Sequence, residues 1–326
     1  MINKVVVVGL GSIAKRHRQN IKELFPNAIV YAIPSSARKV TTSVDFCDEI
    51  VNDINELKVK DFQLAIIASP SSFHAKHSIP FIESNVPTII EKPIAATVSD
   101  AYKIIDSQLK YETKVGVGYC LRFLPSFQCF RKLLQANKVG DIQSVFIEVG
   151  QYLPDWRSDK NYKKSVSASK ELGGGALLEL SHEVDYAFNL FGELELQYGC
   201  QQASSELGLE VEDCVDLVAT TKHHIPVNIH LDFLQKKPAR FCKVVGSKGV
   251  MQLDFINNEI TFTDSHLTEK LFSEPSWDKN LMYINMLKQF LSLDNEIDTP
   301  LASIEDSAQV VQFIDFIKSS CVLIKR

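Results

Sequence analysis

The sequence lacks the features that mark several classes of protein. No stretch approaches the roughly 18 apolar residues that a membrane-spanning helix needs, and glycines soon interrupt the apolar run near the N-terminus. The seven cysteines are scattered and never form a CxxC pair, which argues against a disulfide framework and a zinc site. The eight histidines show no metal-binding spacing, so we expect no metal.

Charge of either sign is also nearly balanced. The 35 Lys+Arg residues and 40 Asp+Glu residues leave a net charge of −5. Such a charge gives no bulk attraction to nucleic acid or to an anionic lipid surface, so neither is an expected partner. With no cleavable leader evident at the N-terminus, we expect a cytoplasmic protein.

The first part of the chain alternates short apolar runs with helix-length segments. The 326 residues are enough for two domains. Continuous apolar runs separated in this way are typical of buried parallel strands with helical crossovers, so we expect a doubly wound parallel α/β sheet. The expected strands lie at 5–9, 28–33, 64–69, 87–91 and 114–118.

After residue 118 the pattern changes to strand-like runs joined by short turns. This pattern predicts an open, mainly antiparallel sheet, with helices at 176–191 and 304–318 that interrupt or close it. We therefore divide the chain into domains at 1–120 and 121–326, with the helix 304–318 able to pack back on the first domain. The strand-like runs cover 142–153, 211–222, 226–235 and 239–255.

A glycine-rich turn with the pattern GxGxxA follows the first expected strand. Gly9 permits a tight turn, Gly11 lets the backbone approach a pyrophosphate, and Ala14 is small enough for close packing of helix on strand. The pyrophosphate would lie at the N-terminus of the helix that follows, beside Ser12 and Ile13. The first domain is therefore predicted to bind a dinucleotide.

The end of the second expected strand bears on which dinucleotide is bound. NAD-binding proteins usually have a carboxylate here for the ribose 2′-hydroxyl, yet the sequence has none between Leu24 and Val44. It has Ser35, Ser36, Arg38 and Lys39 instead, which favours the 2′-phosphate of NADP. The alternative is a solvated loop that binds NAD without an acid.

Two further segments follow the fourth and fifth expected strands. The first contains Ser69, Pro70 and His74, and the second is Glu91-Lys92-Pro93. Residues just beyond the carboxyl ends of parallel strands line the crevice where ligands bind. Lys92 is therefore a candidate proton donor or acceptor for a carbinol oxygen, and the alternative is a surface lysine paired with Glu91.

These segments together resemble the glucose-fructose oxidoreductase / inositol dehydrogenase / MocA (Gfo/Idh/MocA) family of NAD(P)-dependent enzymes. The resemblance implies a Rossmann domain and a second α/β domain that binds substrate and forms an oligomer interface. It also implies that Lys92 and His182 are the catalytic pair, with Arg122 near cofactor and substrate. The motifs that carry it are GLGSIA (9–14), SPSSFH (69–74), EKP (91–93), GYCLRFLP (118–125), GDI (140–142) and GGGALLELSHEVD (173–185).

The segment around His182 has a helical pattern of its own. Three glycines, 173–175, can bring a helix start close to a ligand, and Glu179 lies three residues before His182, on a neighbouring helix position. Glu179 is thus a candidate to orient His182 in catalysis, although many family members have an Asp where this chain has Leu178. Asp185 is a second candidate acid, with a capping or structural role as the alternative. A merely packed or solvated histidine is the alternative for His182.

A long loop with excess positive charge is expected between 152 and 170. From Arg157 to Lys170 it holds five cations and one acid. Either it is a solvated surface, or it recognises an anionic substrate with Trp156 and Tyr162 stacked on a ring. The segments YLPDW, GGG and SHEVD resemble family members of bacterial surface-sugar pathways.

We therefore hypothesise an NAD(P)-dependent oxidoreductase that interconverts a secondary alcohol and a ketone on a sugar derivative, assembled as a homo-oligomer. The rival hypotheses are a non-catalytic dinucleotide-binding sensor and a redox-neutral enzyme with tightly held nicotinamide. The expected substrate contacts are Tyr119, Arg122, Trp156, Arg157, Tyr162 and His182. The expected cofactor contacts are Gly9, Gly11, Ser12, Ile13, Ser35, Ser36, Arg38, Ser69, Pro70, His74, Glu91, Lys92 and Arg122.

Overall fold

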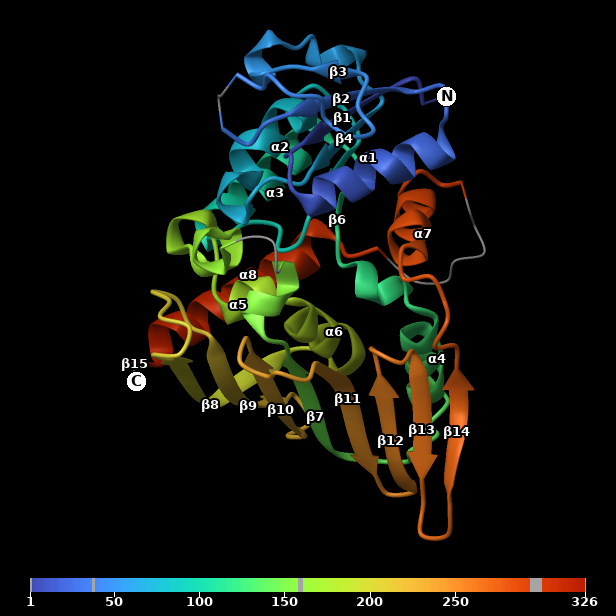
Figure 1. Ribbon diagram of the computed structural model, residues 1–326. Coiled ribbons are helices and arrows are strands. Elements are labelled where there is room, and N and C mark those ends of the chain that lie inside the picture. The colour runs from blue at the N-terminus through green and yellow to red at the C-terminus, as the bar shows by residue number, and fades with distance from the viewer. Residues whose placement is uncertain (1, 37–38, 158–160, 294–300, 326) are drawn as a thin grey trace. The chain divides into compact units, whose positions relative to one another are not determined.

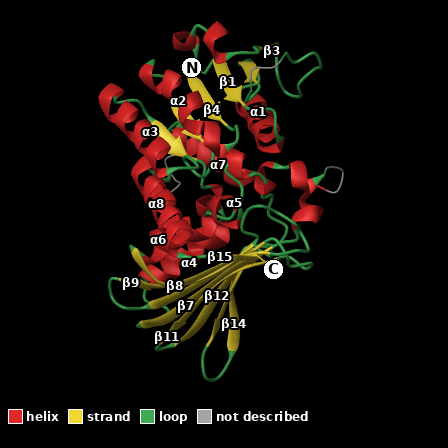
Figure 2. Ribbon diagram, turned by 90° about the vertical axis from the view of Figure 1, so that its left-hand side faces the viewer, coloured by secondary structure: helices red, strands yellow, loops and turns green. Residues whose placement is uncertain are grey.

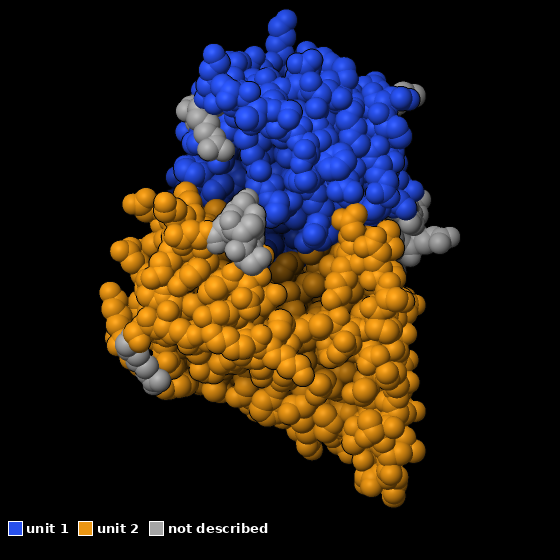
Figure 3. Space-filling model, in the orientation of Figure 1, with its two compact units in different colours: residues 1–119, 283–312 blue, residues 120–282, 313–326 orange. Residues whose placement is uncertain are grey.

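The computed structural model describes residues 2–36, 39–157, 161–293 and 301–325, which fall into two compact units. Unit 1 comprises 1–119 and 283–312, and unit 2 comprises 120–282 and 313–326 (Figure 3). The chain therefore returns to unit 1 after most of unit 2 is complete.

Unit 1 is built on a six-stranded parallel sheet with the order β3-β2-β1-β4-β5-β6. This is the strand order of a Rossmann fold, and it confirms the predicted doubly wound sheet. The side chains of β1 from Val5 to Val8 and all of β4 are fully buried, which explains why these strands are continuous apolar runs. The strands are β1 (Lys4–Val8), β2 (Ile29–Ile33), β3 (Glu49–Ile50), β4 (Leu64–Ile67), β5 (Thr88–Ile90) and β6 (Val115–Val117).

Helices cover both faces of this sheet, with α1 on one face and α3 on the other (Figure 2). The Thr97 hydroxyl caps α3 by accepting a hydrogen bond from the backbone N–H of Asp100 (3.2 Å). The helices are α1 (Ser12–Leu24), α2 (His74–Glu83), α3 (Val98–Tyr111) and α7 (Leu281–Phe290), with α8 (Ile304–Ser320) continuing from unit 1 into unit 2. Short 3-10 turns lie at η1 (Ile54–Glu56), η2 (Val59–Asp61) and η3 (Ser71–Phe73).

Unit 2 contains a nine-stranded sheet with the order β14-β13-β12-β11-β7-β10-β9-β8-β15. Only the pairs β7·β10 and β8·β15 are parallel, so the expectation of a mainly antiparallel sheet is confirmed. Its strands are β7 (Ile142–Gly150), β8 (Leu194–Ala203), β9 (Cys214–Thr221), β10 (Pro226–Asp232), β11 (Ala239–Gly246), β12 (Gly249–Asp254), β13 (Glu259–Thr263), β14 (Thr268–Ser273) and β15 (Leu323–Lys325).

The helices of unit 2 lie on one face of its sheet (Figures 1 and 2). The strands alternate accordingly: in β7, Val145, Ile147 and Val149 are buried beneath the helices, whereas Phe146 is 36% exposed on the other face. That second face, which we call the open face, carries no helix in the described part of unit 2. The helical elements are η4 (Cys120–Phe123), α4 (Pro125–Gln135), α5 (Ala176–Glu179) and α6 (His182–Phe191).

Two expectations about local structure are wrong. The single helix predicted over 176–191 is two helices, because Leu180 has ψ of 28° and ends α5 before α6 begins. The segment 152–170 is not a plain loop, since four 3-10 turns run through it. These turns are η5 (Leu153–Arg157), η6 (Tyr162–Lys164), η7 (Val166–Ala168) and η8 (Lys170–Leu172).

No helix in the described part of the chain is long and apolar enough to span a bilayer. All seven cysteines lie in that part, and each is a free thiol.

Candidate active site

The glycine turn of unit 1 joins β1 to the N-terminus of α1. Gly9 has φ of +121°, and a Cβ there would lie 2.3 Å from the carbonyl oxygen of Ala68, so the fold itself requires glycine. Gly11 has an ordinary φ of −72°, and a Cβ there would meet no protein atom within 4 Å. Glycine at position 11 is thus not needed for packing within the described protein, but it leaves room for a ligand.

The N-terminus of α1 suits an anion. Its N-cap residue Gly11 has no side chain to cap the first N–H groups, and no acidic residue lies in the first turn. Ser12 is exposed at this end, Ile13 is half-buried, and Ala14 is fully buried, as close packing of helix on strand requires. These features fit the pyrophosphate of a dinucleotide.

Arg18 supports the same turn and was missed by the sequence interpretation. Its side chain is buried, and its Nη1 donates to the carbonyl of Gly9 (3.1 Å) while Nε donates to the carbonyl of Asp45 (2.9 Å). Burial lowers the pKa of Arg18 from its ordinary value. A lone arginine on a helix gives no sequence signal for such a role.

The residues expected to read the ribose follow β2. Ser35 is half-buried, and Ser36 and Lys39 are exposed. Arg38 lies outside the described residues.

The ends of β4 and β5 are joined through His74. Its Nδ1 lies 2.9 Å from the carbonyl oxygen of Pro93, and its Nε2 lies 2.8 Å from that of Ser69. The ring is 1% exposed, and burial lowers its pKa. His74 therefore ties two of the segments predicted to contact cofactor. Pro70 is half-buried beside Ser69.

Lys92 is half-buried and directly follows Glu91. Glu91 is 7% exposed, and its Oε1 accepts a hydrogen bond from Nε2 of His17 at 2.6 Å. The Lys92–Pro93 peptide bond is cis. No sequence pattern indicates His17, which lies 74 residues before Glu91.

In unit 2, the glycine triplet precedes α5, and a buried acid anchors this turn. Gly175 has φ of +102°, and a Cβ there would lie 2.4 Å from the carboxylate of Glu212. That carboxylate accepts from the N–H of Leu177 (3.2 Å) at the start of α5. Glu179, the candidate catalytic acid, is half-buried and accepts from the hydroxyl of Ser167 (3.2 Å).

His182 is the first residue of α6 and is 8% exposed. Two ion pairs hold this helix, one buried on both sides and one with a partly exposed arginine. Arg122 makes two hydrogen bonds with Asp185 (2.9 and 2.6 Å), and Arg240 makes two with Glu183 (2.8 and 2.9 Å). Asp185 therefore pairs with Arg122, and Arg122, which was expected near the ligands, is 2% exposed.

Most of the remaining predicted substrate residues lie in unit 2, and Tyr119 is the last residue of unit 1 before unit 2 begins. Trp156 packs edge-on against Phe233 (5.3 Å between ring centroids), and its buried Nε1 has no hydrogen-bond partner among the described residues. Tyr162 donates to the carbonyl of Leu207 (3.2 Å). Tyr119, in unit 1, is 1% exposed. The side chain of Arg157 and residues 158–160 lie outside the described part. Among the described residues of this segment, the exposed cations are Lys163, Lys164 and Lys170.

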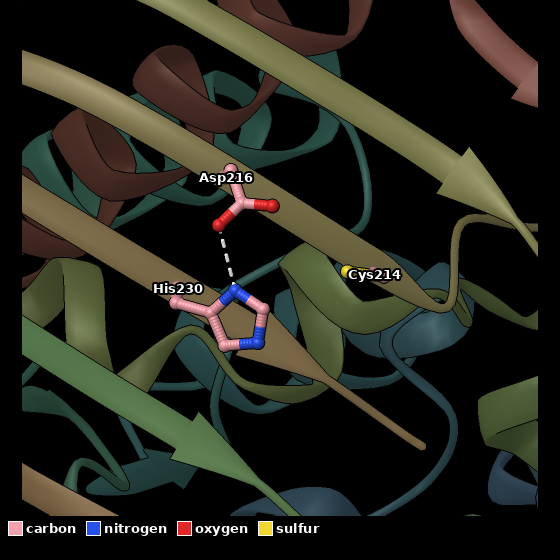
Figure 4. A group of neighbouring side chains, drawn as sticks. All are labelled: Cys214, Asp216 and His230. Atoms are coloured by element: carbon pink, nitrogen blue, oxygen red, sulfur yellow. Dashed lines mark hydrogen bonds and ion pairs between the residues drawn. The ribbon is translucent and has the colours of Figure 1, made fainter. Parts of the chain in front are cut away.

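One group of side chains has the residue types of a metal site. Figure 4 shows His230 of β10 facing Asp216 of β9, with Cys214 earlier on β9, and their ligand atoms all lie within 4.8 Å of one another. The imidazole also contacts Asp232 (2.9 Å), and Asp232 and Asp216 (2.7 Å) raise the pKa of His230 to about 9, against the effect of burial. Burial and these acids raise the pKa of Cys214 to about 12. At neutral pH a metal would have to displace both protons, so we describe the group as an imidazolium between two carboxylates.

Comparison with known sequence families gives two matches. Residues 3–119 match the family described as "Oxidoreductase family, NAD-binding Rossmann fold". Residues 127–252 match the "GFO/IDH/MocA C-terminal domain".

Individual proteins are more distant. A glucose-6-phosphate 3-dehydrogenase from Bacillus subtilis is 22% identical over 197 residues, a stretch that spans 58% of this chain and 54% of that relative. A 3-ketoreductase from Actinomadura kijaniata, solved with NADP and TDP-benzene, superposes with a TM-score of 0.82 at 17% identity over 100% of both chains. A levoglucosan dehydrogenase solved with NADH gives a TM-score of 0.80 at 19% identity, over 98% of this chain and 96% of that one. At these identities the structures establish a shared fold.

Proposed function

The chain belongs to the Gfo/Idh/MocA oxidoreductase family, and from that membership we propose that it uses NAD(P) to interconvert a secondary alcohol and a ketone on a sugar, nucleotide-sugar or acidic-sugar derivative. The observation that supports this most directly is the uncapped N-terminus of α1 behind Gly11, at the carboxyl end of the sheet that also carries Lys92. Unit 1 would bind the dinucleotide and residues 121–326 the substrate.

The cofactor assignment uses residues that fit the group. Gly9, Gly11, Ser12 and Ile13 would hold the pyrophosphate, and Ser69, Pro70 and His74 would line the crevice beyond β4. Ser35, Ser36 and Arg38 favour NADP over NAD because they offer hydroxyls and a cation to a 2′-phosphate and no carboxylate opposes it. A bound nicotinamide supplies the hydride acceptor or donor.

Proton transfer is assigned to this chain's own side chains. In oxidation the Nζ of Lys92 takes the proton of the substrate hydroxyl while hydride leaves the carbon that bears this hydroxyl. In reduction Lys92 returns a proton to the carbonyl oxygen. His182 polarises the oxygen or relays the proton, and Glu179 orients His182. Arg122 would contact both the cofactor and the substrate, Glu91 the cofactor, and Tyr119 the substrate.

The substrate class rests on charge. Lys163, Lys164 and Lys170 are exposed and Tyr162 is half-buried in the same segment, and this composition suits a carboxylate or phosphate on a sugar. Trp156, whose Nε1 has no described partner, would offer a ring and a donor, with Arg157 beside it. The likeness of the YLPDW and SHEVD segments to surface-sugar enzymes supports a role in surface-polysaccharide biosynthesis.

We also propose that the open face of the nine-stranded sheet binds a second copy of the chain. One row of paired residues crosses this face, from Tyr198 through Val218 and Asn228 to Phe146. Tyr198 is 63% exposed and Phe146 is 36% exposed, and exposed aromatic side chains on a flat sheet are typical of interfaces. Sedimentation analysis of the native chain and of Tyr198→Glu tests this proposal. We expect an oligomer for the native chain and dissociation in Tyr198→Glu, and a monomeric native protein contradicts the proposal.

Turnover tests the enzymatic assignment. The protein is incubated with NADP⁺ or NAD⁺ and a panel that contains glucose 6-phosphate, levoglucosan, a uronate sugar and nucleotide sugars, and nicotinamide absorbance is followed. Lys92→Met should lower kcat for the accepted substrate ~100-fold or more while cofactor affinity is kept. The matched control is Lys103→Met, which removes an exposed lysine of α3.

Three outcomes would redirect the assignment. Unchanged kcat in Lys92→Met contradicts the role of this lysine. Saturable nucleotide binding without turnover favours a sensor. A nucleotide that co-purifies and never exchanges favours a redox-neutral reaction with tightly held nicotinamide.

A further inference from the structure

We propose that His17 and Glu91 form a positioning pair, which holds the backbone of Lys92 in a fixed place relative to the helix that follows the glycine turn. The inference rests on the proposed function of Lys92 and extends it to two residues that do not touch the substrate. All the residues involved belong to unit 1.

The contact between the two side chains is short and removed from water. Nε2 of His17 and Oε1 of Glu91 are 2.6 Å apart, His17 is fully buried, and Glu91 is 7% exposed. An ionised carboxylate only accepts hydrogen bonds, so Nε2 carries the hydrogen. Nδ1 of His17 has no hydrogen-bond partner among the described residues. The bond to Glu91 is therefore the polar contact that accounts for a histidine at this buried position.

Glu91 is confined from a second side by β6. A Cβ at Gly118 would lie 3.1 Å from the carboxylate carbon and from both its oxygens. The N–H of Gly118 also donates to the carbonyl of Ile90 (2.8 Å), which fixes the strand end just before Glu91. The carboxylate therefore lies between the His17 ring and a backbone that has no side chain, and it has little freedom to move.

The confined carboxylate acts on Lys92 through the main chain. The backbone N–H of Lys92 lies 3.3 Å from Oε2 of Glu91, and the next residue, Pro93, has its carbonyl 2.9 Å from His74. Buried histidines thus hold the residues on both sides of Lys92. Because the pair acts on Lys92 through the main chain, His17 and Glu91 are positioning residues, and Lys92 is the catalytic residue of this segment.

The pair also connects two parts of the site that are distant in sequence. His17 lies in the second turn of α1, the helix whose N-terminus would bind the pyrophosphate, and Glu91 follows β5. The bond therefore sets the distance between the cofactor end of α1 and the lysine. A displacement of a reacting group by about 1 Å can cost ~100-fold in rate, so loss of the bond should lower kcat more than it lowers affinity.

The experiment uses three variants that disturb the pair from different sides and one matched control. His17→Leu removes the donor, Glu91→Gln removes the charge, and Gly118→Ala crowds the carboxylate. His17→Gln retains an N–H donor and serves as the conservative variant. Thr113→Val is the control, because it also deletes a fully buried hydrogen bond of unit 1 (Thr113 Oγ1 to the carbonyl of Ile82, 2.5 Å). Thr113 lies at the amino end of β6, whereas Glu91 and Lys92 follow the carboxyl end of β5.

Two readouts separate positioning from stability. The first is the rate at which a water-soluble anhydride acetylates Lys92, measured by mass spectrometry against exposed Lys103 in the same sample. The second is kcat, with the substrate found in the panel, together with NADPH affinity.

We expect faster labelling of Lys92 and a kcat about 10- to 100-fold lower in the three variants, with NADPH affinity nearly unchanged in His17→Leu and Gly118→Ala. His17→Gln should restore part of both, and Thr113→Val should lower the melting temperature alone. If a variant does not fold, the other two decide.

Labelling of Lys92 that stays at the native rate in the folded variants overturns the proposal, as does an equal change in Thr113→Val. The labelling arm needs no substrate, so it gives its answer even if the panel yields no turnover. A kcat of Lys92→Met that equals the native value, by contrast, refutes the proposed function of Lys92 but not the positioning pair.

Discussion

The Arg122–Asp185 pair allows a quantitative prediction about the helix that carries His182. Both side chains are 2% exposed, and the guanidinium makes two hydrogen bonds with the carboxylate. Replacing Asp185 with Asn keeps the shape but leaves the charge of Arg122 uncompensated. Breaking a buried pair in this way typically costs about 3–5 kcal/mol, so the free energy of unfolding of unit 2 should fall by that amount.

Tryptophan fluorescence in urea measures this loss in the correct unit, because Trp156 and Trp277 are the two tryptophans and both lie in unit 2. For a denaturant slope of about 2–3 kcal/mol per molar urea, the midpoint should fall by about 1–2.5 M.

Glu269→Gln is the control, because its pair with Lys138 also lies in unit 2 but is about one-third or more exposed, and it should be worth at most about 1 kcal/mol. The double variant Arg122→Met/Asp185→Leu should recover most of the loss, since it removes both charges. If Asp185→Asn shifts the midpoint no more than Glu269→Gln, the reasoning from burial is wrong.

Other predictions follow from single residues. Burial lowers the pKa of His77 to about 4, below its unfolded value of about 6.5. Because the unfolded chain therefore binds the proton first, the free energy of unfolding should fall by about 2 kcal/mol between pH 7 and pH 5. Urea titrations at several pH values should show that His77→Gln removes this effect. The pH dependence that His230 contributes has the opposite sign, because its pKa is raised to about 9. Its stabilisation is complete below pH 6.5, and at most about 2 kcal/mol is lost as the pH rises through 9. His230→Gln should abolish this loss. Gly9→Ala should cost at least about 1–3 kcal/mol of backbone strain because its Cβ would also meet the carbonyl of Ala68. Gly11→Ala should leave the melting temperature unchanged but weaken NADPH binding, and equal effects of the two glycine variants on melting would contradict this distinction.

The parts of the fold that the sequence predicts correctly are those with a strong hydrophobic period. The strands β1, β4 and β5 of unit 1 are buried along almost their whole length, so their positions appear as apolar runs. β3 was not expected, because it has two residues and neither is buried. The strand β13 and its neighbour β14 at the edge of the sheet are short and rich in Glu, Thr and Lys, so they gave too weak a signal to be singled out.

The division of the predicted helix 176–191 shows a different limit. Residues on both sides of Leu180 continue the same helical period, so the pattern does not register a break that one backbone torsion creates. The break follows from separate anchors, with Glu212 at the start of α5 and the arginine pairs on α6.

Within the site, motif positions were predictable and supporting contacts were not. Gly9, Gly11 and Lys92 belong to short motifs whose chemistry depends on local spacing. The bonds of His17 with Glu91 and of Glu183 with Arg240 join residues 74 and 57 positions apart. Such pairs depend on which strands and helices become neighbours, and spacing along the chain carries no information about that.

The central claim is that the turn after β1 binds a nicotinamide dinucleotide, and titration of the purified protein with NADPH and with NADH tests it most directly. Nicotinamide fluorescence is followed in the native chain and in Gly11→Asp, which would fill and charge the space at the N-terminus of α1. We predict saturable binding of both nucleotides by the native chain, tighter for NADPH, and loss of binding in Gly11→Asp while its melting temperature is retained. Absence of saturable binding by the native chain, or undiminished binding by Gly11→Asp, would contradict the account.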